Sequence, residues 1–448
     1  MNTDTIAAIS TAYGTAGISV IRVSGPEAIT KINQIFKGKD LTGVSSHTIH
    51  YGHLRDKKNT IIDEVMVSVL RAPKSFTTED MVEISTHGGI LITQKALEVI
   101  LDQGIRLANP GEFSERAYLN GRIDLVEADS IMDLIHAKNE KAIEVANLGI
   151  QKHTSQLIKD LRSKLLTLIA KIEVNIDYPE YDEAEVMTKE IIKPEVEDLL
   201  KEMEIILKES YKTQLITQGV KTAIIGRPNV GKSSLLNALL NEEKAIVTDI
   251  AGTTRDLVEA TIHIGGIMLN LMDTAGIRTT DDFVEKIGVE RSVKALNEAE
   301  LVLLVLDQSD ELTDEDFKLI EMTKHKSRII IGNKSDLPTR LKLEHVLPVS
   351  SRYKKGLKDL EKEIFKILSL EDLEKRNYHY LANARHIQKV KEAKQALSAV
   401  LASIEQAMSV DILAIDLNRS WQLLGEILGE YFQEDLLNEL FSKFCLGK

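Results

Sequence analysis

The sequence has little cysteine, proline or aromatic residue and no long apolar run. Its 448 residues include one cysteine, Cys445, eight prolines and one tryptophan, and 4% are aromatic. A single cysteine cannot form an internal disulfide or a cysteine-based zinc site by itself, so we expect a reducing compartment. The longest aliphatic run, at 301–306, is far shorter than the about 20 residues of a membrane-spanning helix. Residues 1–10 lack the basic and apolar parts of a signal peptide. We therefore expect a cytoplasmic protein with no membrane partner.

Basic residues are also in deficit, because 56 Lys and Arg face 69 Asp and Glu, for a formal net charge of −13. Binding to a nucleic-acid backbone needs clustered Lys and Arg, so the whole chain is not expected to act as a simple RNA binder. If a nucleic acid is the substrate, a partner protein should supply much of the basic surface. The hydrophobic content of 43% is ordinary for globular proteins, and the length predicts about three domains.

The two ends of the chain have different periodicities. Residues 1–118 are expected to alternate between strands and one or two helices, including a helix that begins near Ile90. The strands are expected at 5–10, 18–23, 64–70 and 81–85, which are rich in Ile and Val. Residues 119–214 and 378–448 instead place apolar side chains three or four positions apart, which is typical of long helices. Tyr178-Pro179 predicts a break between two of them.

The middle of the chain, residues 215–377, alternates short aliphatic strands with helical segments. Strands are expected at 220–225, 268–272, 301–306 and 328–331. This alternation indicates a mostly parallel α/β sheet. Because helical patterns of one kind lie on both sides of it, we infer that the α/β domain is inserted into one helical domain. Two separate helical bundles would give the same pattern.

The strongest motif is the phosphate-loop sequence GxxxxGKS at residues 226–233. It follows a predicted strand and precedes an apolar helix, which is the context that the motif requires. The glycines let the backbone wrap around phosphate oxygens at a helix N-terminus. Lys232 would then bridge the β- and γ-phosphates, and the Ser233 hydroxyl would bind Mg²⁺. A chance match on a surface turn is the alternative.

Three further motifs favour guanine nucleotides. Asp-Thr-Ala-Gly at 273–276 and Asn-Lys-Ser-Asp at 333–336 each follow a predicted strand. The Asp336 carboxylate can accept hydrogen bonds from N1–H and the N2 amine of guanine, a pair that adenine lacks. Ser-Ser-Arg at 350–352 fits the loop that supports the base. The set resembles the translation-factor-related class of GTPases, with ATP as the alternative ligand.

Catalysis in this domain needs an unusual device. Ile277 stands where many small GTPases carry a glutamine that orients the attacking water. Asn229 and the oxygen-rich loop 248–254 offer a shell that suits K⁺, which could replace an arginine finger. Asn229 could equally stabilise a turn. Arg227 and Arg255 could supply charge or lie solvated in their loops.

We therefore expect nucleotide contacts from one set of residues in four loops. They are Asn229, Val230, Gly231, Lys232, Ser233, Ser234, Thr248, Asp249, Ile250, Ala251, Gly252, Thr253, Thr254, Asp273, Thr274, Ala275, Gly276, Asn333, Lys334, Asp336, Ser350, Ser351 and Arg352. Thr254 is the candidate second Mg²⁺ ligand and γ-phosphate sensor, and Lys232 is a candidate catalytic residue.

The two ends of the chain carry a specific family resemblance. The C-terminal Cys-Leu-Gly-Lys at 445–448, together with a GTPase domain inside a helical domain, resembles the MnmE (TrmE) family of tRNA-modification GTPases. Similar signatures occur at 86–89, 109–117, 119–124 and 248–256. The resemblance covers essentially the whole chain. It implies an N-terminal α+β folate-binding and dimerisation domain, a central helical domain and a Ras-like P-loop G domain inserted into the latter.

The resemblance also implies an activity. Members build an aminomethyl or carboxymethylaminomethyl group on C5 of the wobble uridine of tRNA, with a flavoprotein partner, MnmG. The one-carbon unit comes from a reduced folate, 5-formyl- or 5,10-methylene-tetrahydrofolate. FAD belongs to the partner, and this chain agrees, because it has no GxGxxG fingerprint.

Family roles carry over to individual residues. Folate contacts fall on Arg22, Glu83, Arg122 and Lys448, with an arginine at 122 where the family often has lysine. The resemblance also assigns K⁺ to Asn229, Thr248, the Ile250 carbonyl and Thr253, Mg²⁺ to Ser233 and Thr254, and the water-orienting carboxylate to Glu285. Cys445 is a possible functional cysteine, although a lone cysteine is more often a small buried apolar residue.

Two rival functions share the G-domain motifs. A ribosome-assembly switch GTPase usually adds an RNA-binding module or a second G domain, and this sequence has neither a second GKS loop nor a basic C-terminal module. A membrane-remodelling GTPase would need an exposed basic amphipathic or apolar tip, which the sequence lacks. Binding of reduced folate by residues 1–118 as a dimer would distinguish the MnmE function from both.

Overall fold

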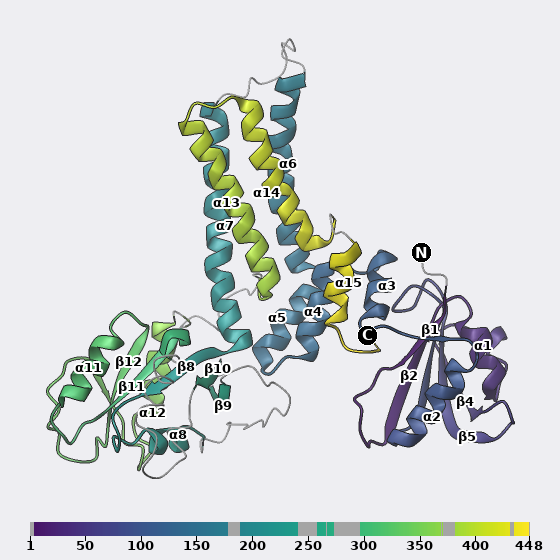
Figure 1. The fold of residues 1–448 in the computed structure, drawn as a ribbon, viewed down its shortest axis with the longest axis horizontal. Helices are drawn as coiled ribbons and strands as arrows, with labels where there is room; N and C mark the ends of the chain where they lie inside the picture. The colour runs from purple at the N-terminus through teal and green to yellow at the C-terminus, as the bar shows by residue number, and fades with distance from the viewer. Residues whose placement is uncertain are drawn as a thin grey trace. The chain divides into compact units, whose positions relative to one another are not determined.

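The computed structural model describes residues 4–177, 189–240, 258–265, 267–272, 296–368, 370, 381–430 and 434–447. They divide into two compact units. The first unit comprises Met1–Met132, Ile158–Arg162 and Trp421–Lys448, and the second comprises Asp133–Leu157 and Ser163–Ser420. Figure 1 labels their helices and strands. Within the described residues, no helix combines the length and apolar character needed to cross a bilayer.

The first unit is built on a seven-stranded sheet in the order β3-β4-β5-β6-β2-β1-β7, of which Figure 1 labels β1, β2, β4 and β5. The strands are β1 (Ile6–Ile9), β2 (Ile18–Ser24), β3 (Phe36–Lys37), β4 (Thr48–Arg55), β5 (Ile61–Leu70), β6 (Met81–His87) and β7 (Arg106–Leu107). Every pairing is antiparallel except that of β1 with β7. Alternate residues such as Ile21, Val67 and Ile84 are buried against the helices α1 (Ala28–Ile35) and α2 (Ile90–Leu101).

A small helical layer in this unit carries the C-terminal segment. It contains α3 (Glu112–Leu119), α4 (Leu125–Ile135) and α15 (Glu434–Ser442). Leu125, Phe441 and Phe444 form its core. The Tyr118 hydroxyl donates to the Gly429 carbonyl at 2.7 Å, and the Gly111 amide donates to the Cys445 carbonyl at 3.3 Å. The end of the chain is therefore fastened to α3.

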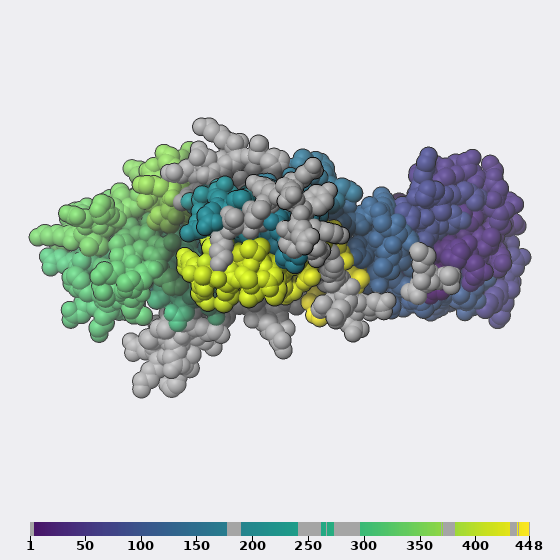
Figure 2. Space-filling model, turned by 90° about the horizontal axis from the view of Figure 1, so that it is seen from above, coloured from purple at the N-terminus to yellow at the C-terminus, as the bar shows by residue number. Residues whose placement is uncertain are grey.

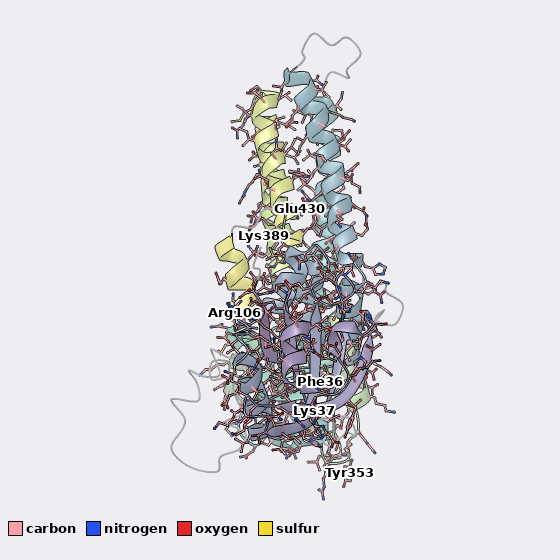
Figure 3. The ribbon with its side chains drawn as sticks, turned by 90° about the vertical axis from the view of Figure 1, so that its right-hand side faces the viewer. Phe36, Lys37, Arg106, Tyr353, Lys389 and Glu430 are labelled. Carbon is pink, nitrogen blue, oxygen red and sulfur yellow. The ribbon has the colours of Figure 1, made fainter. Side chains whose placement is uncertain are left out.

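Long helices dominate one part of the second unit. They are α5 (Glu140–Ile150), α7 (Lys189–Gln218) and α13 (Ala384–Glu405), together with most of α6 (His153–Asp177) and the first part of α14 (Val410–Leu428). Helix α13 packs along α7 (Figures 1 and 2), where Leu397 and Met203 are both fully buried. Their outer faces carry polar side chains, such as the pair of Lys389 with Glu392 at 3.1 Å (Figure 3). Pro194 lies inside α7 without ending it, whereas Tyr178-Pro179 lies outside the described residues.

The other part of the second unit is an α/β domain between α7 and α13. Its sheet has the order β13-β12-β11-β8-β10-β9. The strands are β8 (Val220–Ile225), β9 (Val258–Ile264), β10 (Ile267–Met272), β11 (Leu301–Asp307), β12 (Arg328–Asn333) and β13 (Val346–Pro348). All pairings are parallel except β9 with β10. The helices α8 (Lys232–Leu240), α11 (Asp314–Met322) and α12 (Leu357–Ile367) belong to this domain.

The predicted fold class is confirmed, because long helices precede and follow the α/β domain in the chain. All eight predicted strands are present. The structure adds β3, β4, β7, β9 and β13, which the sequence analysis missed. Strand β4 contains three basic or imidazole side chains and one glycine among eight residues, so it lacks the apolar alternation that marks a strand. Strand β13 has only three residues. The exact domain boundaries at 118, 214 and 377 stay a prediction.

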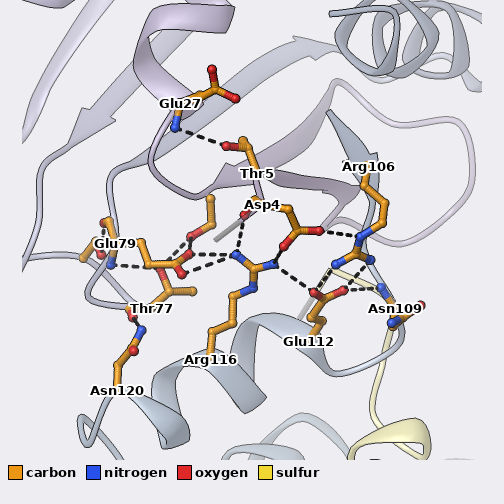
Figure 4. A network of polar contacts seen from close by, with 12 residues as sticks. Asp4, Thr5, Glu27, Thr77, Glu79, Arg106, Asn109, Glu112, Arg116 and Asn120 are labelled. Carbon is orange, nitrogen blue, oxygen red and sulfur yellow. Dashed lines mark hydrogen bonds and ion pairs between the residues drawn. The ribbon is translucent and has the colours of Figure 1, made fainter. Parts of the chain in front are cut away.

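A buried ion-pair network fastens the N-terminal segment of the first unit to α3 (Figure 4). Glu112 accepts hydrogen bonds from Arg106 at 2.5 and 3.0 Å and from Arg116 at 3.0 Å. Its side chain is 3% exposed and that of Arg116 is 5% exposed. Arg116 also pairs with Asp4 at 2.7 Å and with Glu79 at 3.2 Å. The two arginines therefore pair with three carboxylates where β1, β7 and α3 meet.

The pKa of Glu112 reflects this balance. Burial alone would raise it, but hydrogen bonds from Arg106, the Asn109 amide and Arg116 outweigh burial, so the pKa lies below the ordinary value of 4.5. A carboxylate with a lowered folded-state pKa contributes stability above its unfolded-state pKa and loses it as the pH falls. Glu115 has the opposite shift, because burial and the nearby Glu112 raise its pKa.

Glu112→Gln should destabilise the first unit by about 3 kcal/mol at pH 7, because it leaves the buried Arg116 short of a counter-charge. Hydrogen exchange of the β1 and β7 amides in the full chain measures this loss. The difference from the wild type should shrink as the pH falls below 4.5, where Glu112 of the unfolded chain becomes protonated.

Glu115→Gln is the matched control for this substitution. It removes a half-buried charge whose pKa is raised, so exchange at pH 7 should be unchanged or slower. Equal destabilisation by both substitutions would contradict a specific role for the Glu112 ion pairs.

Candidate functional site

The phosphate loop connects β8 to α8, as the sequence predicts. It begins after Ile225 and ends where α8 starts at Lys232. Gly231 has φ +97°, and a Cβ there would collide with the Asn333 side-chain nitrogen. Asn229 also has a left-handed backbone, with φ 62°, which asparagine tolerates better than most residues. The loop therefore has the tight curvature that a phosphate-binding backbone needs.

Lys232 lies at the inner side of this loop. Its ammonium group donates to the carbonyls of Gly226 at 2.6 Å and Arg227 at 2.9 Å, and burial lowers its pKa. Ser233 and Ser234 follow at the exposed start of α8. A lysine, a serine hydroxyl and a helix N-terminus within three residues fit a nucleotide phosphate with Mg²⁺.

The two loops expected to bind guanine are held against each other. The Asn333 amide donates to the Val230 carbonyl at 2.9 Å, and its oxygen accepts from the Ser351 hydroxyl at 2.8 Å. The Ser350 hydroxyl donates to Asp336 at 2.6 Å, and this bond holds the pKa of Asp336 below its ordinary value.

Two basic residues of the set flank this arrangement. Lys334 pairs with Asp307 at 2.6 Å. The Arg352 guanidinium lies 5.5 Å from the centre of the Tyr353 ring. The Ser350 hydrogen bond is the largest cause of the lowered pKa of Asp336, and the positive charge of Arg352 lowers that pKa further. Five predicted contacts, Val230, Asn333, Asp336, Ser350 and Ser351, thus belong to one connected group. The ionised Asp336 carboxylate is the acceptor that guanine requires.

Several predicted residues lie outside the described part of the chain. They are Thr248, Asp249, Ile250, Ala251, Gly252, Thr253, Thr254, Asp273, Thr274, Ala275, Gly276, Glu285 and Lys448. Their roles stay predictions, including three of the four K⁺ ligands and the water-orienting carboxylate.

A second group of predicted residues meets in the first unit. Arg22 on β2 and Glu83 on β6 are direct cross-strand partners, joined by hydrogen bonds of 2.8 and 2.9 Å. The guanidinium groups of Arg22 and Arg122 lie 5.6 and 5.2 Å from the centre of the Phe76 ring. Arg122 also donates to the Ser75 carbonyl at 2.7 Å. Residues far apart in the sequence are therefore gathered around one aromatic ring.

The C-terminal segment reaches the same group. Arg22 donates to the Gly447 carbonyl at 3.3 Å, and so does the Ser10 hydroxyl at 3.1 Å. Gly447 has φ +85°, and a Cβ there would collide with the Ile9 carbonyl, so only glycine fits this close approach. Cys445 is exposed and is not part of the Phe441–Phe444 core, so the alternative of a small buried residue does not apply, and its possible functional role stays a prediction.

Sequence analysis missed Phe76, Phe113 and Ser10 in this group. The centre of the Phe113 ring lies 5.7 Å from the Arg22 guanidinium, and the Phe76 ring is in contact with both arginines. Phe113 stands inside one of the quoted signatures, at 109–117. No spacing rule connects Phe76 with Arg22 or Arg122, so their meeting could not be read from the chain.

Comparison with known proteins identifies the family. The MnmE helical domain family matches residues 125–445, and the family described as GTP-binding protein TrmE N-terminus matches residues 5–122. The chain is 63% identical to the tRNA modification GTPase MnmE of Acholeplasma laidlawii (strain PG-8A) over 448 residues, which is 100% of both chains. The chain belongs to the MnmE (TrmE) family of tRNA-modification GTPases.

Other members of the MnmE family agree. The chain is 54% identical to the relative of Aster yellows witches'-broom phytoplasma (strain AYWB) over 99% of both chains. It is 50% identical to that of Bacillus cytotoxicus over 100% of both chains.

Among solved structures, a complex of Era with MgGDPNP and 16S ribosomal RNA nucleotides is 29% identical over 33% of this chain and 55% of that chain, with a TM-score of 0.26.

Family membership decides between the functions that the sequence left open. The protein is a GTP-binding tRNA-modification GTPase, so the predicted resemblance is confirmed and the ribosome-assembly reading is not needed. The P-loop domain between α7 and α13 is the G domain of this MnmE-family chain, and the connected loops around Asn333 belong to it.

Asp336→Asn should exchange the base preference of this G domain. Asparagine offers one donor and one acceptor, which match the C2 carbonyl and N1–H of xanthine but not the two donors of guanine. We expect GTP affinity to fall by about 100-fold or more and XTP affinity to rise. Because the diphosphates carry the same bases, we expect the same changes for GDP and XDP, and equilibrium binding of these two nucleotides to the full chain measures them.

Thr339→Ala is a suitable control because its exposed side chain lies in the same loop and bonds Gln308 rather than Asp336. Unchanged base preference in Asp336→Asn would show that the base is not read by this carboxylate.

Proposed function

We propose that this chain installs aminomethyl or carboxymethylaminomethyl groups at C5 of the wobble uridine of tRNA, together with a flavoprotein partner of the MnmG type. A reduced folate, 5-formyl- or 5,10-methylene-tetrahydrofolate, serves as one-carbon donor, and FAD belongs to the partner. The observation that carries the folate part is the meeting of Arg22, Glu83 and Arg122 around Phe76.

The chemistry of this group fits a folate. A pterin ring carries N–H groups that a carboxylate such as Glu83 can accept, and its flat face can pack on an aromatic ring such as Phe76. Arg22 and Arg122 supply positive charge for the glutamate tail. The bound folate supplies the one-carbon unit. Lys448 follows Gly447 directly in the chain, and Gly447 contacts Arg22, which supports its assignment to the same site.

A second copy of the chain is the expected partner of the first unit. The open face of its sheet exposes large apolar side chains on neighbouring strands. Tyr51 on β4 is 64% exposed and pairs directly with Met66 on β5, which is 50% exposed. Ile49 and Ile18 are 61% and 63% exposed. Adjacent exposed apolar residues of this size mark an interaction surface, so we assign this face to the homodimer.

GTP hydrolysis in the G domain is expected to use Mg²⁺ and K⁺. Ser233 and Thr254 would hold Mg²⁺, while Asn229, Thr248, Ile250 and Thr253 would hold K⁺. The place of Asn229 inside the phosphate loop, three residues before Lys232, supports this assignment. K⁺ would supply positive charge near the phosphates, in place of an arginine finger, and Glu285 would orient water.

Nucleoside mass spectrometry of tRNA tests the proposed function. Cells lacking this gene should lose the C5-aminomethyl-type uridines, and the intact gene should restore them. A Lys232→Ala copy should not, because it removes the phosphate-loop ammonium. A Glu83→Gln copy should restore little while its GTP hydrolysis stays normal, because the pterin acceptor is lost and the G domain is intact.

Glu98→Gln, at an exposed position on α2, is the matched control for Glu83→Gln and should restore modification fully. Binding of 5-formyl-tetrahydrofolate to the purified dimer should be lost in Glu83→Gln and retained in Glu98→Gln. Full modification by Glu83→Gln would refute the folate assignment, and an unchanged nucleoside profile in the deletion would refute the pathway.

Hydrolysis should also depend on the monovalent cation. We expect kcat for GTP to be at least about tenfold higher in KCl than in NaCl of equal ionic strength, because a bound cation stabilises charge in the transition state. Asn229→Ala should abolish that difference, while Asn297→Ala, an exposed position in the same domain, should preserve it. Equal rates of the wild type in both salts would exclude the K⁺ site.

A further inference from the structure

Arg227, the second residue of the phosphate loop, does not extend freely into solvent. Its Nη2 donates to Asp310 at 2.7 Å, and its Nε lies 3.3 Å from Asp316. The guanidinium is 20% exposed, Asp310 is 53% exposed and Asp316 is 3% exposed. Asp310 lies in the connection between β11 and α11, and Asp316 lies in the first turn of α11. The phosphate loop is thus tied by its side chain to a neighbouring segment.

Asp316 is a buried charge that needs a cation. Its Oδ2 accepts from the Thr313 amide at 3.0 Å and from the Thr313 hydroxyl at 2.8 Å. The Asp316 amide in turn donates to the Thr313 hydroxyl at 3.4 Å, which completes the capping box of α11. Its Oδ1 is buried and accepts no hydrogen bond from the described residues. Burial of a carboxylate is costly unless a positive charge is near. Among its contacts, Arg227 is the cation that meets this need.

At its other end, the segment 307–316 contacts Asn333 and Lys334 at the end of β12, in the predicted guanine-binding motif. Asp307 pairs with Lys334 at 2.6 Å, and the Gln308 amide donates to the Asn333 carbonyl at 2.8 Å. The segment 307–316 therefore contacts the phosphate loop through Asp310 and Asp316. It contacts Asn333 and Lys334 through Gln308 and Asp307.

The backbone carbonyl of Arg227 points toward Lys232 inside the phosphate loop, whereas its side chain points toward the segment 307–316. Its carbonyl accepts a hydrogen bond from Lys232 at 2.9 Å. Fixing the side chain therefore fixes the carbonyl that orients the Lys232 ammonium. An arginine engaged with two carboxylates is also poorly available to a phosphate, since Asp310 and Asp316 already neutralise it.

We propose that Arg227 is a positioning residue for the guanine nucleotide. Its ion pairs with Asp310 and Asp316 hold the phosphate loop in the shape that retains GTP and GDP, and the side chain takes no part in the hydrolytic step. Loss of this clamp weakens nucleotide affinity in the ground state and the transition state alike.

Nucleotide affinity and kcat, measured on the full chain, separate this role from a catalytic one. Arg227→Met should raise the Kd and the dissociation rate of GDP about tenfold, with kcat at saturating GTP within about twofold of wild type, the signature of lost uniform binding. Arg227→Lys should restore part of the affinity, because a point charge replaces a two-carboxylate fork. Asp310→Asn should weaken affinity less, since that partner is half exposed.

A double-mutant cycle and a control complete the test. Arg227→Met with Asp310→Asn should bind no more weakly than Arg227→Met alone, because both remove one contact. Arg340→Met, at an exposed position of the same domain, should behave as wild type. If Arg227→Met proves unfolded, Arg227→Lys and Asp310→Asn still decide the question. A fall in kcat at saturation with unchanged affinity, or fully additive effects of Arg227→Met and Asp310→Asn, would overturn the proposal.

Discussion

The amide side chain of Asn333 joins the parts of the nucleotide site. It donates to the Val230 carbonyl of the phosphate loop and accepts from the amide and hydroxyl of Ser351, so one 2%-exposed side chain holds three loops together. Each loop follows a strand of the same parallel sheet, whose carboxyl ends meet at one edge. Buried polar groups of this kind are costly when unpaired, so the loops are held in a single arrangement.

In the first unit, ion pairs hold separate segments together, as the Asn333 hydrogen bonds do in the nucleotide site. Five charged side chains, Asp4, Glu79, Arg106, Glu112 and Arg116, join the start of the chain to α3. The Phe76 ring lies against Arg22 and Arg122 nearby in the same unit. Folding of this unit must bring both chain ends together, because the Gly447 carbonyl accepts from Arg22 and Ser10.

Much of the fold could be predicted from the sequence, because its strands are apolar and its helices are long. The run at 301–306 becomes the fully buried centre of β11, and the phosphate loop lies between a strand and a helix as the motif requires. Strand β4 was missed because its exposed face carries Ile49 and Tyr51, while Leu54 is the one large apolar side chain on its buried face. A strand with apolar residues on its exposed face does not show the usual alternation of buried apolar and exposed polar residues.

The sequence by itself determined the family, the G domain and most candidate residues, because those depend on local motifs whose order along the chain is preserved. Only the tertiary structure decided which of those residues meet. Phe76 contacts Arg22 and Arg122, and Arg227 pairs with Asp310 and Asp316. The positions that meet in these contacts have no periodic relation in the sequence. The exposure of Cys445 also follows from the packing of the first unit. Such contacts arise from the packing of whole elements, which no local spacing encodes.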